Sequence, residues 1–127
     1  MAQGTIFTNI TNKVATITFY HPSSNSFPSA LINKLIDSFD RLSQDENVHV
    51  IVLKSDGNKA FCAGASFDEL LQVESLEEGI KFFSGFANLI NAMRKCEKLI
   101  IGRVQGKTVG GGEGIIAATD YSFATEA

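Results

Sequence analysis

Apolar and polar residues alternate near the start of the chain and then change to a helical period. Residues Thr5–Ile10 read as a first strand, Thr11–Lys13 form a short turn, and residues Val14–Tyr20 alternate with Val14 and Ile17 slightly out of step. That pattern predicts a β-hairpin. The proline and small polar residues at 21–26 interrupt regular structure, so we expect a loop there.

Two longer segments have the apolar period of amphipathic helices. The first runs from about Pro28 to Gln44. The second runs from Leu76 to about Lys95 and follows Ser75, a residue type that caps helices. The apolar stripe of the second helix is expected to contain Ile80, Phe83, Phe86, Ala87, Ile90 and Met93, with Phe82 and Leu89 beside it.

Three further stretches predict strands, and a short helix lies between the first two. The first stretch is nearly continuous β-branched sequence, which fits a strand buried on both faces of a parallel sheet. We expect Ser66 to cap a helix over 67–73, with Glu69 as its capping-box partner. A hairpin followed by alternating helices and strands indicates an α/β fold. The stretches are Val48–Lys54, Leu99–Val104 and Asp120–Thr125.

Three consecutive glycines, Gly110 to Gly112, follow the strand at 99–104 and precede a helix-like run at 115–118. Backbone N–H groups without side chains beside them can approach a ligand closely. The first N–H groups of a helix lack internal partners and favour negative charge. The corner therefore suits an oxygen that is, or becomes, anionic. Taken alone, the stretch is equally consistent with glycines that only let two backbones pack closely.

Composition excludes several classes of function. The 127 residues suffice for one small domain, and a net charge of -3 gives no electrostatic reason to expect nucleic acid or a membrane surface as partner. No apolar run is long enough to span a bilayer, and residues 1–4 lack the blocks of a signal peptide. Two cysteines make no disulfide framework, so we expect reduced thiols and a cytoplasmic location. Neither histidine lies at metal-ligand spacing, so no metal is expected.

A second glycine loop, Ala63–Ala65, follows the predicted buried strand at 48–54. Ligands of parallel sheets gather where chains leave the carboxyl ends of the strands. One N–H group from each glycine loop is therefore in a position to meet the same oxygen.

Three segments carry a resemblance to a known family. Residues 61–66 read F-C-A-G-A-S, residues 105–112 read Q-G-K-T-V-G-G-G before A-A-T-D at 117–120, and Pro22 to Asn25 introduces the first long helix. Together they resemble the crotonase superfamily, the enoyl-CoA hydratase/isomerase group, with its F-C-A-G-A-D, N-G-x-x-x-G-G-G and P-x-x-x-N segments. The resemblance covers nearly the whole chain, and the two loops are specific only in combination.

The resemblance implies a crotonase-like ββα spiral and a thioester of coenzyme A as substrate, with no cofactor beyond the coenzyme A of that substrate. It places an oxyanion hole at the backbone N–H groups of Ala65 and Gly111. It also implies that the turn at 23–24 and the loop at 63–67 flank the nucleotide and pantetheine end of coenzyme A. The residues implied for substrate contact are Ser23, Ser24, Ala63, Gly64, Ala65, Ser66, Phe67 and Gly111.

The chain departs from the family pattern at two positions. Many hydratases of the family carry a catalytic Glu at the position of Gly114, which has no side chain here. Glu113 is one residue earlier, about 100° around a helix, and is better explained as an acidic first-turn residue. Ser66 replaces the Asp of the family segment but can still cap a helix.

The family's domain is also longer than this chain. Residues 1–127 are therefore expected to be the N-terminal portion of a single crotonase-like domain, truncated before the acyl pocket is complete. Such a portion leaves apolar surface uncovered, which predicts self-association into a homo-oligomer.

Hydration or isomerisation of an enoyl-CoA is the favoured activity, with decarboxylation or thioester hydrolysis as other reactions of the same family. One alternative is a nucleotide-binding module, because Gly102 with Gly106, Lys107 and Thr108 is one residue short of a P-loop, and 112–117 fits a relaxed dinucleotide fingerprint. Another is a catalytically inactive, self-associating half-domain.

Overall fold

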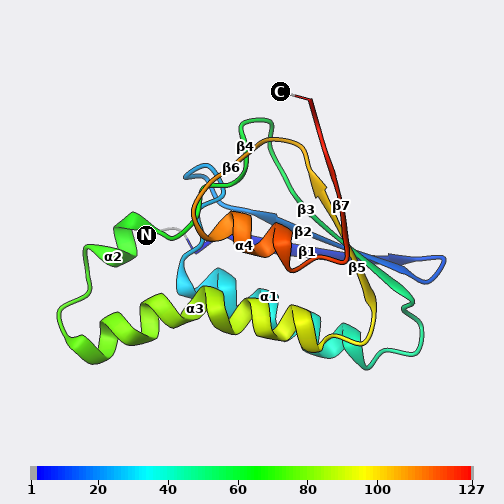
Figure 1. The fold of residues 1–127 in the computed structure, drawn as a ribbon, viewed down its shortest axis with the longest axis horizontal. Coiled ribbons are helices and arrows are strands. Elements are labelled where there is room, and N and C mark those ends of the chain that lie inside the picture. The colour runs from blue at the N-terminus through cyan, green and yellow to red at the C-terminus, as the bar shows by residue number, and fades with distance from the viewer. Residues whose placement is uncertain (1–2, 127) are drawn as a thin grey trace.

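The computed structural model describes residues 3–126, which form an α/β arrangement with helices packed on one side of a sheet (Figure 1). The larger sheet has the strand order β1-β2-β3-β5-β7, and a second sheet pairs β4 with β6. Of the strand pairs within residues 3–126, β1–β2 alone is antiparallel. The elements are β1 (Thr5–Thr11), β2 (Val14–Tyr20), α1 (Ser29–Ser43), β3 (Val50–Ser55), β4 (Ala60–Cys62), α2 (Phe67–Leu70), α3 (Leu76–Lys95), β5 (Leu99–Val104), β6 (Lys107–Thr108), α4 (Gly111–Ala117) and β7 (Tyr121–Ala124).

The order of elements confirms the α/β prediction, and the β1–β2 hairpin lies where the alternating pattern placed it. Its turn residues Asn12 and Lys13 both have positive φ, as a two-residue type I′ hairpin turn requires. No helix among residues 3–126 combines the length and the apolarity needed to cross a bilayer.

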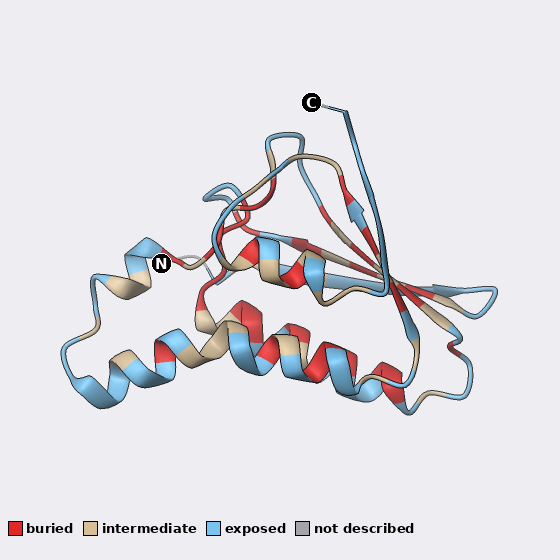
Figure 2. Cartoon of the chain, viewed as in Figure 1, coloured by how far each residue is buried: buried red, intermediate tan, exposed pale blue. Residues whose placement is uncertain are grey.

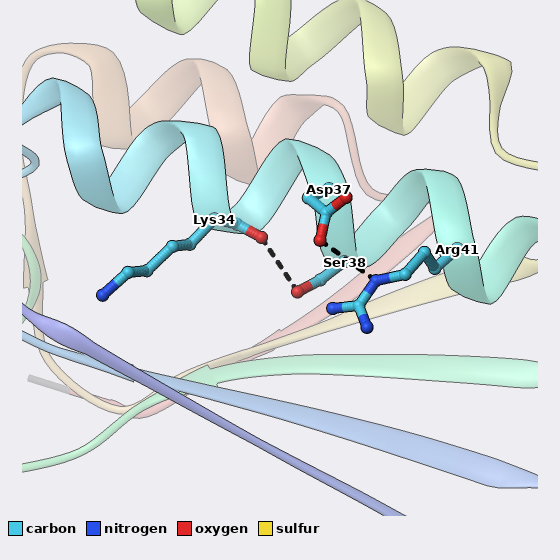
Figure 3. Close-up of polar contacts among 4 residues, drawn as sticks. All are labelled: Lys34, Asp37, Ser38 and Arg41. Atoms are coloured by element: carbon cyan, nitrogen blue, oxygen red, sulfur yellow. Dashed lines mark hydrogen bonds and ion pairs between the residues drawn. The ribbon is translucent and has the colours of Figure 1, made fainter.

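Helix α1 buries the predicted apolar stripe, including Leu31, Leu35 and Phe39, against the sheet. On the helix itself, Arg41 Nε lies 3.0 Å from Asp37 Oδ2, and Ser38 Oγ donates to the carbonyl of Lys34 at 2.9 Å (Figure 3). The ion pair is exposed, so its contribution to stability is small. Burial of the apolar stripe is what holds α1 in place.

Helix α3 has the predicted bounds, and Ser75 Oγ caps it by accepting from Glu78 N at 3.1 Å. The predicted apolar stripe is wrong at three positions, because Ile80 and Phe83 are 60% and 68% exposed and Ala87 is exposed as well. The buried residues of α3 are Phe82, Leu89, Ala92 and Met93. The first turns of α3 extend beyond the N-terminal start of α1 and are mostly exposed (Figures 1 and 2). A helical period predicts which residues share a face, but not where along the helix a neighbour covers that face.

Helix α2 is shorter than the predicted helix over 67–73, and only half of the predicted capping box forms. Ser66 Oγ accepts from Glu69 N at 3.3 Å as expected. Glu69 does not bond back to Ser66, whose N–H donates to Phe27 O. Instead, Glu69 Oε2 accepts from Ser29 N at 2.7 Å and so caps α1, whose own N-cap residue is a proline without a side-chain acceptor.

The core lies between the larger sheet and helices α1 and α3. Strand β3 buries Ile51 and Leu53 on this side, while Val50 and Val52 on the other side are only half-buried. The prediction that this strand is buried on both faces is therefore met on one face. A continuous apolar run does not distinguish the two cases, because both faces of the strand carry apolar residues.

Candidate functional site

The two glycine loops lie against each other at the end of the small sheet. Strands β4 and β6 run parallel, and Val109 N donates to Cys62 O at 3.1 Å just where the strands end. A Cβ atom built at Gly64 would lie 3.2 Å from Val109 O and 3.7 Å from Gly111 N. Neither short strand was predicted, because two or three residues are too few to show a period of two.

In the first loop, one N–H group stands out. Ala63, Gly64 and Ser66 each donate a hydrogen bond to a neighbouring acceptor, at 3.2–3.4 Å. The N–H of Ala65 donates to no acceptor among residues 3–126. Phe27 pairs with Ala65 in a parallel bridge, accepting from Ser66 and donating to Gly64 O at 2.7 Å. Because successive N–H groups of an extended chain point to opposite edges, the Ala65 N–H points away from Phe27.

The second loop leaves donors unpaired at the start of α4. This helix begins at Gly111, four residues before the predicted run at 115–118. The Gly112 and Glu113 N–H groups donate back to Val109 O and Gly110 O, each at 3.1 Å. Those of Gly110 and Gly111 donate to nothing within the described part of the chain. Gly110 has φ 58° and ψ −132°, a conformation that L side chains rarely adopt.

A row of four phenylalanine rings supports both loops. Phe86 of α3 stacks on Phe27 at 5.6 Å, Phe27 meets Phe19 edge-on at 4.9 Å, and Phe19 meets Phe61 at 5.3 Å. A Cβ atom at Gly111 would stand 2.7 Å from the Phe86 ring, and Phe61 belongs to the strand that leads into the first loop. The sequence gives no sign of this row, because the four phenylalanines come from separate segments and are not related by a helix or strand period.

Cys62 fills the space behind the loops. Its side chain is fully buried, and a Cβ atom at Gly112 would lie 2.9 Å from Cys62 Cβ. Burial raises the pKa of the Cys62 thiol from its ordinary value of 9.0 to about 11, and a hydrogen bond from the Gly64 N–H lowers this pKa by a smaller amount. The thiol is therefore protonated at neutral pH and serves as packing rather than as a nucleophile.

The turn implied to contact coenzyme A lies beside the first loop, because Asn25 O accepts from Ala63 N at 3.3 Å. Ser23 and Ser24 are exposed there, and Ser24 lines a cavity of about 190 Å³. The other implied residues differ in exposure. Ser66 is buried and used as a cap, whereas Phe67 is 76% exposed.

Gly114 faces a larger cavity of about 740 Å³ between the second half of α3 and α4. A Cβ atom at this position would lie 3.0 Å from Ile90 Cδ1, the flexible end of another cavity-lining side chain. Glu113 is exposed on the first turn of α4. Position 114 therefore opens onto a cavity, whereas Glu113 is exposed on the surface of the helix.

The nucleotide-binding alternative does not fit the observed elements. Lys107 and Thr108 lie in strand β6, whereas a P-loop places these residues at the start of a helix. Gly112 lies inside α4 rather than at a strand-to-helix turn. Within residues 3–126, no three His, Cys, Asp or Glu side chains gather in a way that could hold a metal ion.

Both the sequence and the fold of the chain are similar to those of known proteins. Residues 9–127 match the family model described as Enoyl-CoA hydratase/isomerase. The chain is 32% identical to 6-oxocyclohex-1-ene-1-carbonyl-CoA hydrolase of Geobacter metallireducens and 30% identical to mitochondrial 3-hydroxyisobutyryl-CoA hydrolase of Homo sapiens. Each match covers 80% of this chain and 27% of the relative. The crystal structure of an enoyl-CoA hydratase from Mycobacterium smegmatis superposes with a TM-score of 0.87 at 29% identity, over 94% of this chain and 47% of that one.

Proposed function

The chain belongs to the enoyl-CoA hydratase/isomerase family, that is, to the crotonase superfamily and its fold, and from this premise we propose that it binds an acyl-CoA thioester whose carbonyl oxygen accepts from the N–H groups of Ala65 and Gly111. One observation carries the proposal. The two loops touch at Gly64 and Gly110–Gly111, and beside this contact the N–H groups of Ala65 and Gly111 donate to no acceptor among residues 3–126.

The proposed chemistry is stabilisation of an enolate. In hydration, water adds to the β-carbon of the enoyl group, and in isomerisation a base removes a proton next to the thioester carbonyl. In both reactions the electron pair moves toward the carbonyl oxygen, which gains negative charge. Two N–H groups already fixed by their loops stabilise that charge without having to reorganise, and removal of one such donor typically costs about 10²- to 10³-fold in rate. The packed phenylalanine row and the bonds from Phe27 supply the required rigidity.

The coenzyme A portion of the substrate is proposed to lie along the turn at Ser23–Ser24 and the loop at 63–67. The exposure of both serines and the cavity beside Ser24 support this placement. No cofactor is needed apart from the coenzyme A that the substrate carries. The free thiols of Cys62 and Cys96 support a reducing, cytoplasmic environment.

Within the family, hydration or isomerisation of an enoyl-CoA is the proposed reaction. Thioester hydrolysis is a second candidate, because two of the relatives are named as CoA hydrolases. Both reactions need the same two N–H groups. They differ in the carbon that water attacks. Hydration adds water to the β-carbon through an enolate, whereas hydrolysis adds water to the carbonyl carbon through a tetrahedral oxyanion and releases the thiol of coenzyme A. Gly114 cannot supply or remove a proton in either reaction.

A catalytically inactive, self-associating unit is the alternative from another class. Large apolar side chains of α2, α3 and β7 are exposed, and the chain spans about a quarter of the length of the two hydrolases that it matches. Sedimentation that depends on concentration, together with no turnover of crotonyl-CoA, would favour this alternative. The exposed side chains are Phe67, Leu71, Leu76, Ile80, Phe83, Tyr121 and Phe123.

The proposal is tested by comparing the affinity of the chain for crotonyl-CoA with its affinity for the matching thioether, in which a methylene group replaces the carbonyl. We expect tighter binding of the thioester, since only the thioester has an oxygen for the two N–H groups. Equal affinity for both ligands would contradict the oxyanion assignment. Product analysis with crotonyl-CoA then separates hydration from thioester hydrolysis.

A further inference from the structure

Asn25 connects three segments behind the first glycine loop. Its side-chain Oδ1 accepts from His21 N at 2.7 Å, and its Nδ2 donates to Asp56 O at 2.9 Å and to Ala60 O at 2.8 Å. The residue is buried, with 3% of its surface exposed. One side chain thus uses both donors and its acceptor to join the 21–26 turn to the segment between β3 and β4.

The backbone of Asn25 extends the same connection to the loop itself. Its carbonyl accepts from Ala63 N at 3.3 Å, and two residues later Phe27 binds Gly64 O and Ser66 N. Asn25 also has φ 59°, in the left-handed region that Asn tolerates better than most residues with a side chain. The turn therefore needs a residue that accepts this backbone conformation and also fills three hydrogen bonds.

These contacts lie on both sides of Ala65 along the chain. On its N-terminal side, Ala60 and Ala63 are bound to Asn25, and on both sides its immediate neighbours are bound to Phe27. The N–H of Ala65 is left unpaired on the side away from these segments. A shift of Asn25 would move the start of β4 and the first residue of the loop together.

We propose that Asn25 is a positioning residue for the reaction: by holding Ala60 and Ala63, it aims the Ala65 N–H at the thioester oxygen. The hydrogen bonds of Asn25 reach His21, Asp56, Ala60 and Ala63 but not Ala65 itself, so its effect on the Ala65 N–H passes through the backbone at 60–63. This inference rests on the proposed oxyanion role of Ala65 and Gly111 and adds a residue that the role depends on.

The test compares two identical substitutions at asparagines with positive φ. Asn25→Gly removes the three side-chain bonds but keeps the backbone conformation accessible. Asn12→Gly makes the same substitution at φ 51° in the β1–β2 turn, where the asparagine side chain makes no hydrogen bond with residues 3–126. This turn lies at the far end of the sheet from the loops (Figure 1). Both variants and the unaltered chain are titrated with crotonyl-CoA, its thioether and free coenzyme A.

We expect Asn25→Gly to lose most of the preference for the thioester over the thioether, because the Ala65 N–H is no longer held toward the carbonyl oxygen. Both ligands carry coenzyme A, so a change at the Ser23–Ser24 turn affects both alike and the ratio of their affinities reports the oxyanion contacts. A tenfold loss of preference corresponds to about 1.4 kcal/mol. Asn12→Gly should keep the preference. If Asn25→Gly keeps it as well, the positioning role is overturned. If the unaltered chain shows no preference, the proposed function fails instead, and the two results are thereby distinguished.

A measurement on the unaltered chain covers the case in which Asn25→Gly does not fold. Amide hydrogen exchange is followed with and without crotonyl-CoA. We expect the thioester to slow exchange at the Ala65 N–H and at the Asn25 side-chain amide together, and to slow both more than the thioether does. Protection of Ala65 without any change at the Asn25 side chain would contradict the proposal.

Discussion

The ring of Phe86 lies directly over the backbone of Gly111, so that a Cβ atom at position 111 would stand 2.7 Å from three of its ring carbons. That distance is shorter than real contacts allow, and Phe86 is itself stacked on Phe27. Gly111 is therefore required by packing as well as by its proposed ligand. The same packing fixes where its N–H group points.

Gly111→Ala should destabilise the fold by about 1–3 kcal/mol, because the added methyl group must displace Phe86 or α4. Any crotonyl-CoA turnover should fall by about 10²- to 10³-fold as the N–H group moves. Urea unfolding and initial rates measure the two effects. Gly79→Ala is the matched control in α3, where the new methyl group would lie 3.6 Å from Val73 Cγ1. It should raise stability by about 0.4–1 kcal/mol.

Glu69→Ala should cost about 1 kcal/mol of stability, because Ser29 N loses the acceptor that caps α1. Asp68→Ala, at an exposed neighbouring carboxylate, is the control and should cost less. Urea unfolding gives the energies, and the amide chemical shift of Ser29 reports the bond itself. An unchanged Ser29 shift in Glu69→Ala would show that the carboxylate does not cap the helix.

Cys62 should make the fold less stable in alkali. The pKa of its thiol is about 11 in the folded chain against 9.0 in an exposed thiol, so its contribution is complete below pH 9 and is lost as pH rises through 11. The loss is on the order of 2 kcal/mol. Cys62→Ala should flatten this part of the stability profile, whereas Cys96→Ala should leave it in place. Iodoacetamide at pH 8 should label Cys96 well before Cys62.

Gly114→Glu should introduce a proton-transfer group and raise hydration of crotonyl-CoA. The new side chain has a cavity to enter, and the nearest atom to its Cβ, Ile90 Cδ1 at 3.0 Å, is the end of a flexible side chain. General acid–base catalysis is typically worth about 10²- to 10⁴-fold. Gly114→Gln has nearly the same shape without the acid. Equal hydration by the Glu and Gln variants would mean that position 114 does not face the substrate.

Much of the fold was predictable because its long elements have strong periods. The bounds of α3 and β5 agree with their apolar patterns, and Ser66 and Ser75 cap helices as their positions indicated. What failed depended on tertiary partners. Glu69 binds Ser29, forty residues away, and no local pattern could reveal this contact.

Only part of the candidate site could be predicted from the sequence. The glycine loops at 63–65 and 110–112 were identified from sequence, and the structure brings them into contact. Asn25 was noticed only as part of a family segment, because its three side-chain bonds reach residues 21, 56 and 60. Contacts across such separations follow from the fold and leave no trace in local periodicity.

The carbonyl stretching frequency of bound crotonyl-CoA tests most directly whether the N–H groups of Ala65 and Gly111 both donate to the thioester oxygen. Isotope-edited infrared spectra are recorded for crotonyl-CoA with ¹³C at the thioester carbonyl, once free in solution and once with the protein at a saturating concentration. Polarisation by Ala65 and Gly111 predicts a shift to lower frequency that Gly111→Ala diminishes and Asn12→Gly retains. A bound thioester whose carbonyl absorbs at the same frequency as in free solution would contradict the account.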